Sequence, residues 1–353
     1  MAFSATVQDE SFDLNFASSK QSQEQWKSIK FQNGEAWPET LQSPLVWDPS
    51  DFQDEESFVY TLDEDEVIEI TDALDGFKSL QLEYWNAKKH NFLLPTLGPR
   101  LEDLSVELHR GRGFFTLRGL DPTTFSRIEN IVIFLGLSSY IAGRIGRQSL
   151  DAEGRMLNNP VIETYHPIYS TDALPFHSDV LTEVIALYCL STAAAGGRSK
   201  ISSSWKIYNE LALTRPDILV ALATDDWVHN TQVSWHSKPE RPSYKRALLH
   251  LTVDGQIILN FSTHSLQGSP PHPRPAELPP LTARQLEALE VVEQLARKYT
   301  LVTTFLPGDI RFMNNFAMLH SRDPYQNQNG PPRHLLRLWL SSEENGVMIP
   351  ESL

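Results

Sequence analysis

The chain of 353 residues is 41% hydrophobic and 21% charged, which is enough apolar material for the core of one large or two ordinary globular domains. Its formal net charge of −15 at pH 7 argues against nucleic acid as a partner, because an acidic surface repels phosphates. The single cysteine, Cys189, excludes an intramolecular disulfide and permits a reducing compartment. We expect its side chain to be a small buried hydrophobe.

Two sequence features bear on where the protein is located: a possible signal peptide and a possible membrane-spanning helix. The N-terminal stretch MAFSATVQDESFDLNF has no basic segment followed by an apolar run, so we expect no signal peptide. The longest apolar stretch, residues 131–143, is too short to cross a bilayer and predicts a buried helix. We therefore expect a cytoplasmic protein without a membrane partner, and a homo-oligomer is compatible with the sequence.

Residues 1–65 are acidic, contain scattered aromatic side chains and have weak periodicity. We expect an N-terminal arm here, whose Trp37 and Trp47 pack on the main body. Residues 66–353 are expected to form one domain, since no internal repeat or linker divides them.

Helical and strand patterns alternate along the rest of the chain. Helices are expected near 64–90, near 122–142, at 205–214 and at about 282–299. Strands are expected at 112–120, 184–192, 198–204, 256–262, 301–306, 309–315 and 334–341. The capping-box spacing is present at Ser126 and Glu129 and again at Thr282 and Gln285, which marks two helix starts.

The many short strands of the C-terminal half predict the fold class. Their spacing is typical of a sandwich or barrel, so we expect an α+β fold with a mainly β core, a double-stranded β-helix (jelly roll) with flanking helices. The segment 268–280 contains six prolines, which exclude a central strand. It is expected to be a surface loop or a mobile lid.

One short motif is a candidate metal site. Among the eleven histidines, only His177 has an acidic residue, Asp179, two positions later. A third candidate, His320, lies in apolar surroundings 143 residues after His177, which is a plausible distance for strands that meet across a jelly roll. A histidine such as His320 can also be a satisfied core residue.

The last strand pattern, PPRHLLRLWLSS, places two arginines among apolar residues. Alternation puts Arg333, Leu335, Arg337 and Trp339 on one face, and leaves an aliphatic face that packs outward against helices or a second sheet. Buried arginines require anions, which a ligand or an internal salt bridge can supply.

Two histidines and one carboxylate that leave three corners of an octahedron open suit non-haem Fe(II) oxygenases. An oxo-acid cosubstrate and O₂ can fill the open positions. The far carboxylate of such a cosubstrate then needs a fixed cation, and the planar guanidinium of arginine matches a carboxylate in bidentate fashion.

Four segments occur in the order PFHSDV, AAAGGRSKISSSWKIYNELA, LPGDIRFMNNFAMLHSR and RHLLRLWL. Together they resemble the taurine dioxygenase-like (TauD/TfdA) family of Fe(II)/2-oxoglutarate-dependent dioxygenases, in particular its fungal, clavaminate-synthase-like branch. The resemblance covers roughly residues 110–341.

The resemblance implies His177, Asp179 and His320 as the iron ligands. It also implies that Ser199, after the Gly-Gly turn, and Arg333 bind 2-oxoglutarate, with Arg337 near the cosubstrate or the substrate. The implied reaction removes a hydrogen from a small organic substrate in a hydroxylation, desaturation or ring closure, with O₂ consumed and succinate and CO₂ as co-products. Arg337 argues for an anionic group on that substrate, such as a carboxylate or sulfonate.

Further substrate contacts are expected at Arg337, Phe176, Arg147 and Trp339, with Arg144 beside them. For the two arginines of AGRIGRQSL the alternative is a solvated loop, and for the two aromatic residues it is core packing. Two other functions are compatible with the same residues. One is a metal-dependent hydrolase, and the other is a non-catalytic jelly-roll binding protein.

Overall fold

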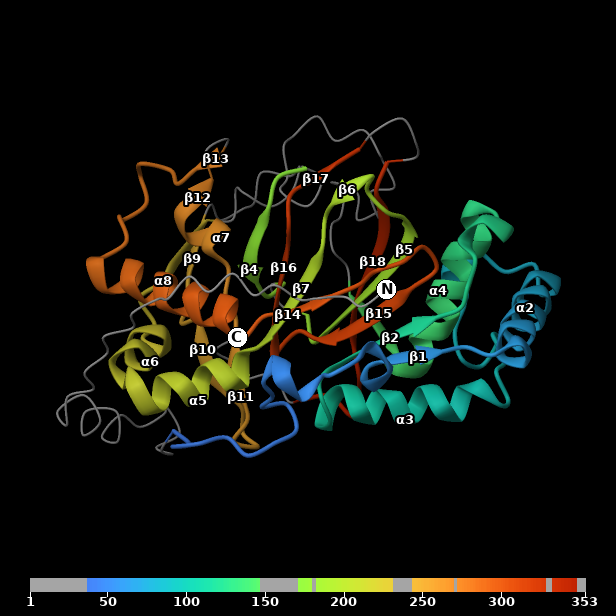
Figure 1. The fold of residues 1–353 in the computed structure, drawn as a ribbon, viewed down its shortest axis with the longest axis horizontal. Helices are drawn as coiled ribbons and strands as arrows, with labels where there is room; N and C mark the ends of the chain where they lie inside the picture. The colour runs from blue at the N-terminus through green and yellow to red at the C-terminus, as the bar shows by residue number, and fades with distance from the viewer. Residues whose placement is uncertain are drawn as a thin grey trace.

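Two β-sheets form the centre of the molecule, and helices cover them on both sides (Figure 1). The computed structural model describes residues 37–146, 171–179, 182–230, 243–269, 272–327 and 332–347. The larger sheet has the strand order β1 (Val59–Thr61), β2 (Phe114–Arg118), β15 (Ile310–Asn314), β5 (Val184–Ser191), β18 (His334–Ser341) and β3 (Arg144–Gly146). The smaller sheet has the order β14 (Leu301–Thr303), β7 (Ser199–Ser203), β16 (Met318–Arg322) and β4 (Leu174–His177).

Four further strand pairs lie outside these sheets. They are β6 (Ala195–Gly196) with β17 (Tyr325–Gln326), β8 (Val228–Asn230) with β9 (Ser243–Lys245), β10 (Leu249–Leu251) with β11 (Ile257–Leu259), and β12 (Gly268–Ser269) with β13 (His272–Pro273). The helices are α2 (Glu64–Ser79), α3 (Leu97–Arg110), α4 (Arg127–Ile141), α5 (Ser204–Thr214), α6 (Pro216–Ala223), α7 (Thr263–Gln267) and α8 (Ala283–Lys298). Short 3-10 helices are η1 (Pro49–Asp51), η2 (Glu55–Ser57), η3 (Tyr84–Asn86) and η4 (Pro122–Thr124).

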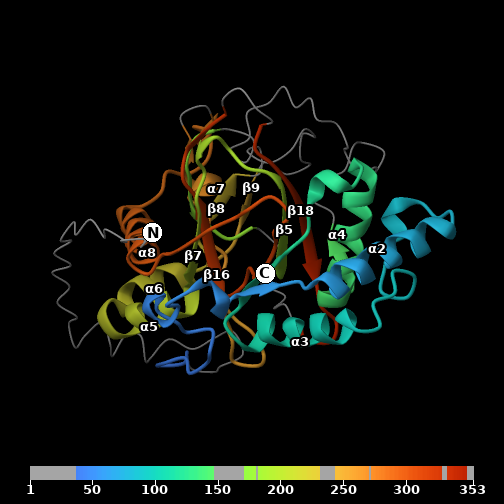
Figure 2. The same ribbon diagram turned by 45° about the vertical axis from the view of Figure 1, so that its right-hand side comes forward.

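The helices are divided between two hydrophobic clusters. Helices α2, α3 and α4 pack on the outer face of the larger sheet, whereas α5, α6 and α8 belong to a cluster that both sheets share. The two views agree on this division, with α2–α4 on one side of the strands and α5, α6 and α8 on the other (Figure 2). Both faces of the larger sheet are therefore covered by protein.

Alternation along the strands of the larger sheet separates an outer from an inner face. In β2, Phe115 belongs to the outer cluster and Phe114 to the inner one. In β18, Leu336, Leu338 and Leu340 pack on the outer cluster, as the sequence predicted for the aliphatic face. Arg337 and Trp339, on the opposite face of β18, therefore point to the interior between the sheets.

The predicted elements match the observed ones with a few differences. The capping boxes at α4 and α8 are confirmed, and the strand patterns correspond to β2, β5, β7, β11, β14, β15 and β18. The helical pattern near 64–90 is wrong beyond Ser79, because Gln81 adopts a positive φ of 54° and the chain continues to the separate helix η3. The sequence did not predict α3 or α6.

The described part of the N-terminal region contacts the body of the protein. Trp37 and Trp47 are buried in the shared cluster, and Trp47 Nε1 donates a hydrogen bond of 2.9 Å to the Arg112 carbonyl. Strand β1 pairs in parallel with β2. The division into an arm, 1–65, and one domain, 66–353, stays a prediction.

The Pro-rich segment forms the two-residue pair β12–β13, and its residues 270 and 271 lie outside the described chain. Arg274 ties the segment down, since its Nη1 donates to the carbonyls of Val228 and Leu266. A lid role for the segment stays a prediction. Among the residues described, every helix is too short or too polar to cross a membrane.

Candidate metal centre and cosubstrate pocket

Three predicted ligands meet at the junction of β4 and β16. His320 lies opposite His177 in the antiparallel pair, and their rings are 4.2 Å apart between centroids. Asp179 follows β4, and its Oδ1 is 3.7 Å from His177 Nε2 and 4.0 Å from His320 Nε2. Within the described residues these three form a group that could hold a metal ion, with ligand atoms within 4.8 Å of one another.

The two oxygens of Asp179 have different surroundings. Oδ2 accepts hydrogen bonds from Arg337 Nη1 at 2.8 Å and from Trp339 Nε1 at 2.7 Å. Oδ1 faces the two histidines. The backbone of Asp179 is held by Asn315, whose side chain accepts from Asp179 N and donates to Asp179 O. Oδ1 is thus the carboxylate oxygen that could bind a metal ion together with the two histidines.

The protonation of the group suits a divalent metal. Burial opposes ionisation of Asp179, but Arg337, the two histidines and the Trp339 N–H outweigh it and lower the pKa to about 2. Burial, together with the charges of His177 and Arg337, lowers the pKa of His320 to about 3. His177 Nδ1 is 2.9 Å from the Pro175 carbonyl, which leaves Nε2 as the ligand atom. Two imidazoles and one carboxylate are the donor set expected for Fe(II).

A pocket of about 350 Å³ lies between strands of the same two sheets, and the three candidate ligands are not among its lining residues. Its walls include Ser199 and Thr303 from the smaller sheet, Cys189 from β5, and Arg333 and Leu335 at the start of β18. The pocket adjoins the metal ligands along the same strands. Ser199 is two residues from Ile201, which pairs with His320, and Leu335 is two residues from Arg337. A two-residue step in a strand is only about 6.6 Å.

Arg333 is a half-buried cation in the wall of the pocket. Burial lowers the pKa of its guanidinium, which lies 5.4 Å from the centroid of the Tyr325 ring. Across the ranges that the structure describes, its guanidinium contacts no carboxylate. An anion in the pocket would supply this missing partner.

The Gly-Gly turn before Ser199 is required by close backbone packing. Gly196 and Gly197 have φ values of +76° and +70°. A Cβ at Gly196 would lie 2.2 Å from the Pro324 carbonyl oxygen. The turn therefore brings the strand that contains Ser199 against the segment that precedes Arg333.

Phe176 and Arg144, two other residues expected near the substrate, are not among the residues that line the pocket. Phe176 is buried in the shared core on the opposite face of β4 from His177, so its position favours core packing over a substrate wall. Arg144 is 70% exposed and paired with Glu343, as in the solvated-loop alternative. Arg147 lies outside the described residues. Cys189 is buried as predicted, and burial raises the pKa of its thiol to about 12.

Sequence reasoning missed four contributions to the site, although it named Arg337 and Trp339 as candidate site residues. The bonds from Arg337 and Trp339 to Asp179 join residues 158 and 160 positions apart, and the Asn315 clamp spans 136. The fourth contributor is Arg311, a buried residue beneath the pocket. Its signal was visible, because an arginine between Ile310 and Phe312 in a strand must point to the face opposite those two apolar residues.

Comparisons with known proteins identify the family. The model of the taurine catabolism dioxygenase TauD, TfdA family matches residues 77–339. The taurine hydroxylase-like protein SAT17 of Stachybotrys chartarum is 37% identical over 329 residues, which are 89% of this chain and 83% of that protein. FR-33289 synthase of Streptomyces rubellomurinus is 25% identical over 333 residues, 89% of this chain and 95% of that protein.

Solved structures share the fold. Asparagine oxygenase in complex with Fe(II), 2S,3S-3-hydroxyasparagine and succinate superposes with a TM-score of 0.62 at 15% identity, over 82% of this chain and 98% of that one. The non-heme iron oxygenase OrfP with Fe and alpha-ketoglutaric acid gives a TM-score of 0.58 at 12% identity, over 81% and 94%. The family match decides between the functions that the sequence left open. The chain belongs to the TauD/TfdA dioxygenase family, and it is an Fe(II)- and 2-oxoglutarate-dependent oxygenase rather than a hydrolase or a non-catalytic binding protein.

Proposed function

We propose that His177, Asp179 and His320 bind the Fe(II) of this oxygenase. The observation that supports this most strongly is the division of Asp179, with Oδ2 bonded to Arg337 and Trp339 and Oδ1 directed at both histidines. When bound, Fe(II) with 2-oxoglutarate and O₂ supplies the oxidant that removes a hydrogen from the substrate, and 2-oxoglutarate leaves as succinate and CO₂. The chain supplies binding, orientation and exclusion of side reactions.

Arg333 and Ser199 are proposed to bind the distal carboxylate of 2-oxoglutarate. Both line the pocket beside the metal ligands, and Arg333 lacks a carboxylate partner among the described residues. A guanidinium and a hydroxyl that face one anion give charge-assisted hydrogen bonds. The keto acid end of the molecule would then lie toward Asp179.

The substrate is proposed to be a small organic anion that undergoes hydroxylation, desaturation or ring closure. Arg337 supports an anionic substrate, because it provides positive charge next to Asp179. The names of similar proteins point to small polar molecules. One is a taurine hydroxylase-like protein, and the fold neighbours were solved with hydroxylated asparagine or arginine.

A turnover screen tests this proposal. Succinate formation would be measured with Fe(II), 2-oxoglutarate and O₂ against a panel of amino acids, sulfonates and carboxylates, each beside its uncharged amide or ester. We expect an anion to stimulate succinate formation more than its neutral partner. Stimulation by neutral compounds alone would contradict the anionic substrate, and turnover without added iron would contradict the metal assignment.

The finer architecture and setting are also proposals. The two sheets are proposed to form a double-stranded β-helix, supported by the hydrophobic cluster to which both contribute. A cytoplasmic location is proposed from the composition and the single buried cysteine, Cys189. Imaging of the tagged full-length chain would test the location.

A further inference from the structure

Arg311 crosses the interior between the two sheets. It lies on β15 between Ile310 and Phe312, which both pack in the outer helical cluster, so its side chain points inward. Its neighbours across the larger sheet are Thr116 on one side and Leu187 on the other, and Leu187 is in turn paired with Arg337. Arg311 and Arg337 are thus two strands apart on the same face, roughly 10 Å at the usual strand spacing.

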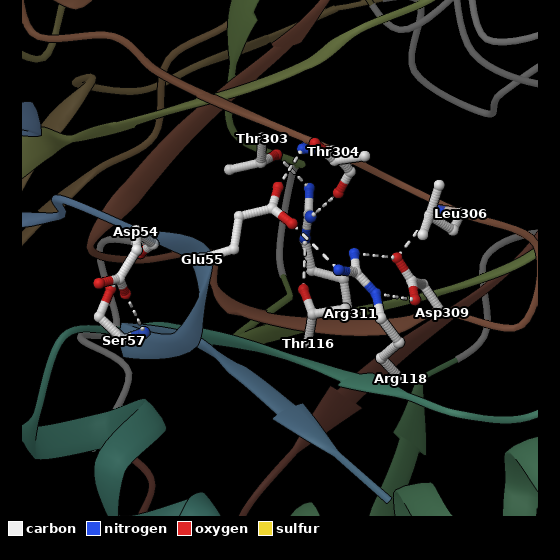
Figure 3. A network of polar contacts seen from close by, with 10 residues as sticks. All are labelled: Asp54, Glu55, Ser57, Thr116, Arg118, Thr303, Thr304, Leu306, Asp309 and Arg311. Atoms are coloured by element: carbon white, nitrogen blue, oxygen red, sulfur yellow. Dashed lines mark hydrogen bonds and ion pairs between the residues drawn. The ribbon is translucent and has the colours of Figure 1, made fainter. Parts of the chain in front are cut away.

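The guanidinium of Arg311 is fully buried, with 0% exposure. Its Nε donates to Thr116 Oγ1 at 3.0 Å, and its Nη2 donates to the Thr304 carbonyl at 2.9 Å. Its Nη1 donates to Ser199 Oγ at 3.1 Å and to Thr303 Oγ1 at 2.6 Å. Figure 3 shows the guanidinium between Thr303 and Thr304 on one side and Thr116 on the other. All four acceptors are uncharged.

The adjacent acidic residues are engaged with another arginine. Asp309 accepts two hydrogen bonds from Arg118, and Glu55 bonds to Arg118 and to the Thr304 amide (Figure 3). The two positive charges of Arg118 and Arg311 are therefore balanced by the two negative charges of Glu55 and Asp309. Arg198, which also lines the pocket, is paired with Asp323, whereas no carboxylate contacts the Arg333 guanidinium in the described part of the chain. Arg333 is therefore available to a ligand carboxylate.

The hydroxyls of Thr303 and Ser199 both accept a hydrogen bond from Arg311, but they differ in whether their own protons have an acceptor. Thr303 Oγ1 also lies 3.2 Å from the Ser199 carbonyl and donates its proton there. Ser199 Oγ accepts from Arg311 and makes no other side-chain hydrogen bond within the described ranges. The guanidinium occupies one of the two lone pairs of this hydroxyl, and its proton has no acceptor among the described residues, so it can donate to an anion in the pocket.

We propose that Arg311 is a positioning residue for 2-oxoglutarate, which holds the Ser199 hydroxyl as a donor to the distal carboxylate and so favours a dicarboxylate over a 2-oxo monoacid. This inference rests on the proposed roles of Arg333 and Ser199. The buried cation also strengthens the donor, since a hydroxyl that accepts from a guanidinium is polarised. Arg311 itself contacts the cosubstrate only through Ser199.

Calorimetric titration of the Mn(II)-loaded protein tests the proposal without turnover. Two ligands would be compared: 2-oxoglutarate, and 2-oxopentanoate, which lacks the distal carboxylate. We expect Ser199→Ala to raise the Kd for 2-oxoglutarate roughly 2- to 10-fold, and Arg311→Gln to raise it by a similar factor and no more than Ser199→Ala does. Both variants should leave the Kd for 2-oxopentanoate within about twofold of wild type, and Arg311→Lys should give an intermediate loss.

A double-mutant cycle separates positioning from general damage. If Arg311 acts through Ser199, adding Ser199→Ala to Arg311→Gln should change the Kd for 2-oxoglutarate less than about twofold. Arg215→Gln removes a half-buried arginine paired with Asp217 and Glu287 far from the pocket, and should bind both ligands as wild type does. If Arg311→Gln does not fold, Arg311→Lys and Ser199→Ala still provide the comparison.

The outcomes distinguish this inference from the proposed function. Unchanged 2-oxoglutarate affinity in Arg311→Gln and Arg311→Lys, or equal weakening of both ligands, overturns the positioning role. If Arg333→Ala also binds 2-oxoglutarate normally, the proposed cosubstrate pocket itself is wrong. If Arg333→Ala alone loses affinity, only the role of Arg311 fails.

Discussion

At the scale of single residues, the site depends on how Asp179 is held. A carboxylate with two free oxygens could rotate or chelate a metal with both. Here Arg337 and Trp339 occupy one oxygen, and Asn315 fixes the backbone on either side of the residue. Groups that orient a ligand in this way commonly change metal affinity when they are removed.

Trp339→Phe should therefore weaken metal binding while the ring remains packed. The change removes the 2.7 Å hydrogen bond to Asp179 Oδ2, and we expect a loss of about 10-fold in Mn(II) affinity, at the low end for such partners. The measurement is a competition titration with a metal-sensitive dye. Trp205→Phe is the matched control, because Trp205 Nε1 donates to the Ile257 carbonyl and, among the described residues, to no group of the candidate site. Equal affinity in the two variants would refute the role of Trp339.

Arg333→Ala and Arg337→Ala should differ in which compound they affect. Loss of a charge-assisted hydrogen bond at Arg333 should raise the KM for 2-oxoglutarate roughly 10- to 150-fold with a smaller change for the substrate. Arg337→Ala should weaken metal binding and raise the KM for the substrate, since it contacts Asp179. Steady-state kinetics in which each compound is varied in turn will decide. If Arg337→Ala alone impairs 2-oxoglutarate, the two roles must be exchanged.

At the scale of elements, short turns and caps place the strands that form the pocket. The β6–β17 pair holds Gly196 directly against Pro324, and the adjacent Gly197 lies against Tyr325 and Arg333. A side chain here must move the backbone, whereas Gly255 has a similar φ of +76° and open space around it. A comparison of substitutions at Gly196 and Gly255 therefore distinguishes the cost of the backbone conformation alone from an additional effect on the pocket.

Gly255→Ala should cost about 1–2 kcal/mol, which is the penalty of a left-handed conformation alone. Gly196→Ala should cost more, because its Cβ would also overlap the Pro324 carbonyl, and it alone should weaken 2-oxoglutarate binding. Urea unfolding and ligand titration of both variants provide the test. Equal stability and equal ligand affinity would show that the turn does not shape the pocket.

The N-terminal cap of α4 gives a prediction with a defined pH dependence. Lys78 and the amide and hydroxyl of Ser126 lower the pKa of Glu129 to about 2. A carboxyl whose pKa is depressed on folding stabilises above its unfolded pKa, near 4.5, and this stability is lost as the pH falls toward 2. Glu129→Gln should therefore lower stability at pH 7 and make less difference at pH 2.5. Urea midpoints at both pH values measure this, and a pH-independent loss would contradict it.

The sequence allowed many of these elements to be predicted. Capping boxes located α4 and α8, and alternation in β18 gave the correct outer face at Leu336, Leu338 and Leu340. Helix α3 was missed because Gly98 and Pro99 interrupt its first turn and no side chain caps it. Contacts such as Arg337 with Asp179 could not be derived, since pairing between distant strands is fixed by tertiary packing.

At the scale of the whole molecule, two sheets and two sets of helices hold the pocket from opposite sides. The ligands of the proposed metal lie at the edge of the smaller sheet, while Arg333, Arg337 and Trp339 come from the larger one. The site is complete only when the sheets are packed together. Stability of the whole fold and occupancy of the site should therefore be coupled.

Buried histidines should make the fold sensitive to acid. Burial, and then the charge of Arg246, lower the pKa values of His229 and His250 to about 4, from an ordinary value of 6.5. The unfolded chain takes up these protons first, so stability should fall as the pH drops from 6.5 through about 4. His229→Gln should lose less stability over this interval in urea unfolding. Parallel curves for variant and wild type would contradict this explanation.

The central claim is that His177, Asp179 and His320 bind Fe(II) in a form that accepts 2-oxoglutarate. Anaerobic titration of the purified protein with Fe(II) and 2-oxoglutarate, followed by the visible charge-transfer absorption of the Fe(II)–2-oxoglutarate complex, tests it most directly. We predict a band that saturates at one iron per chain in the wild type and is absent from Asp179→Ala, whose fold is checked by circular dichroism. A folded Asp179→Ala variant with the same band and the same iron content would contradict the account.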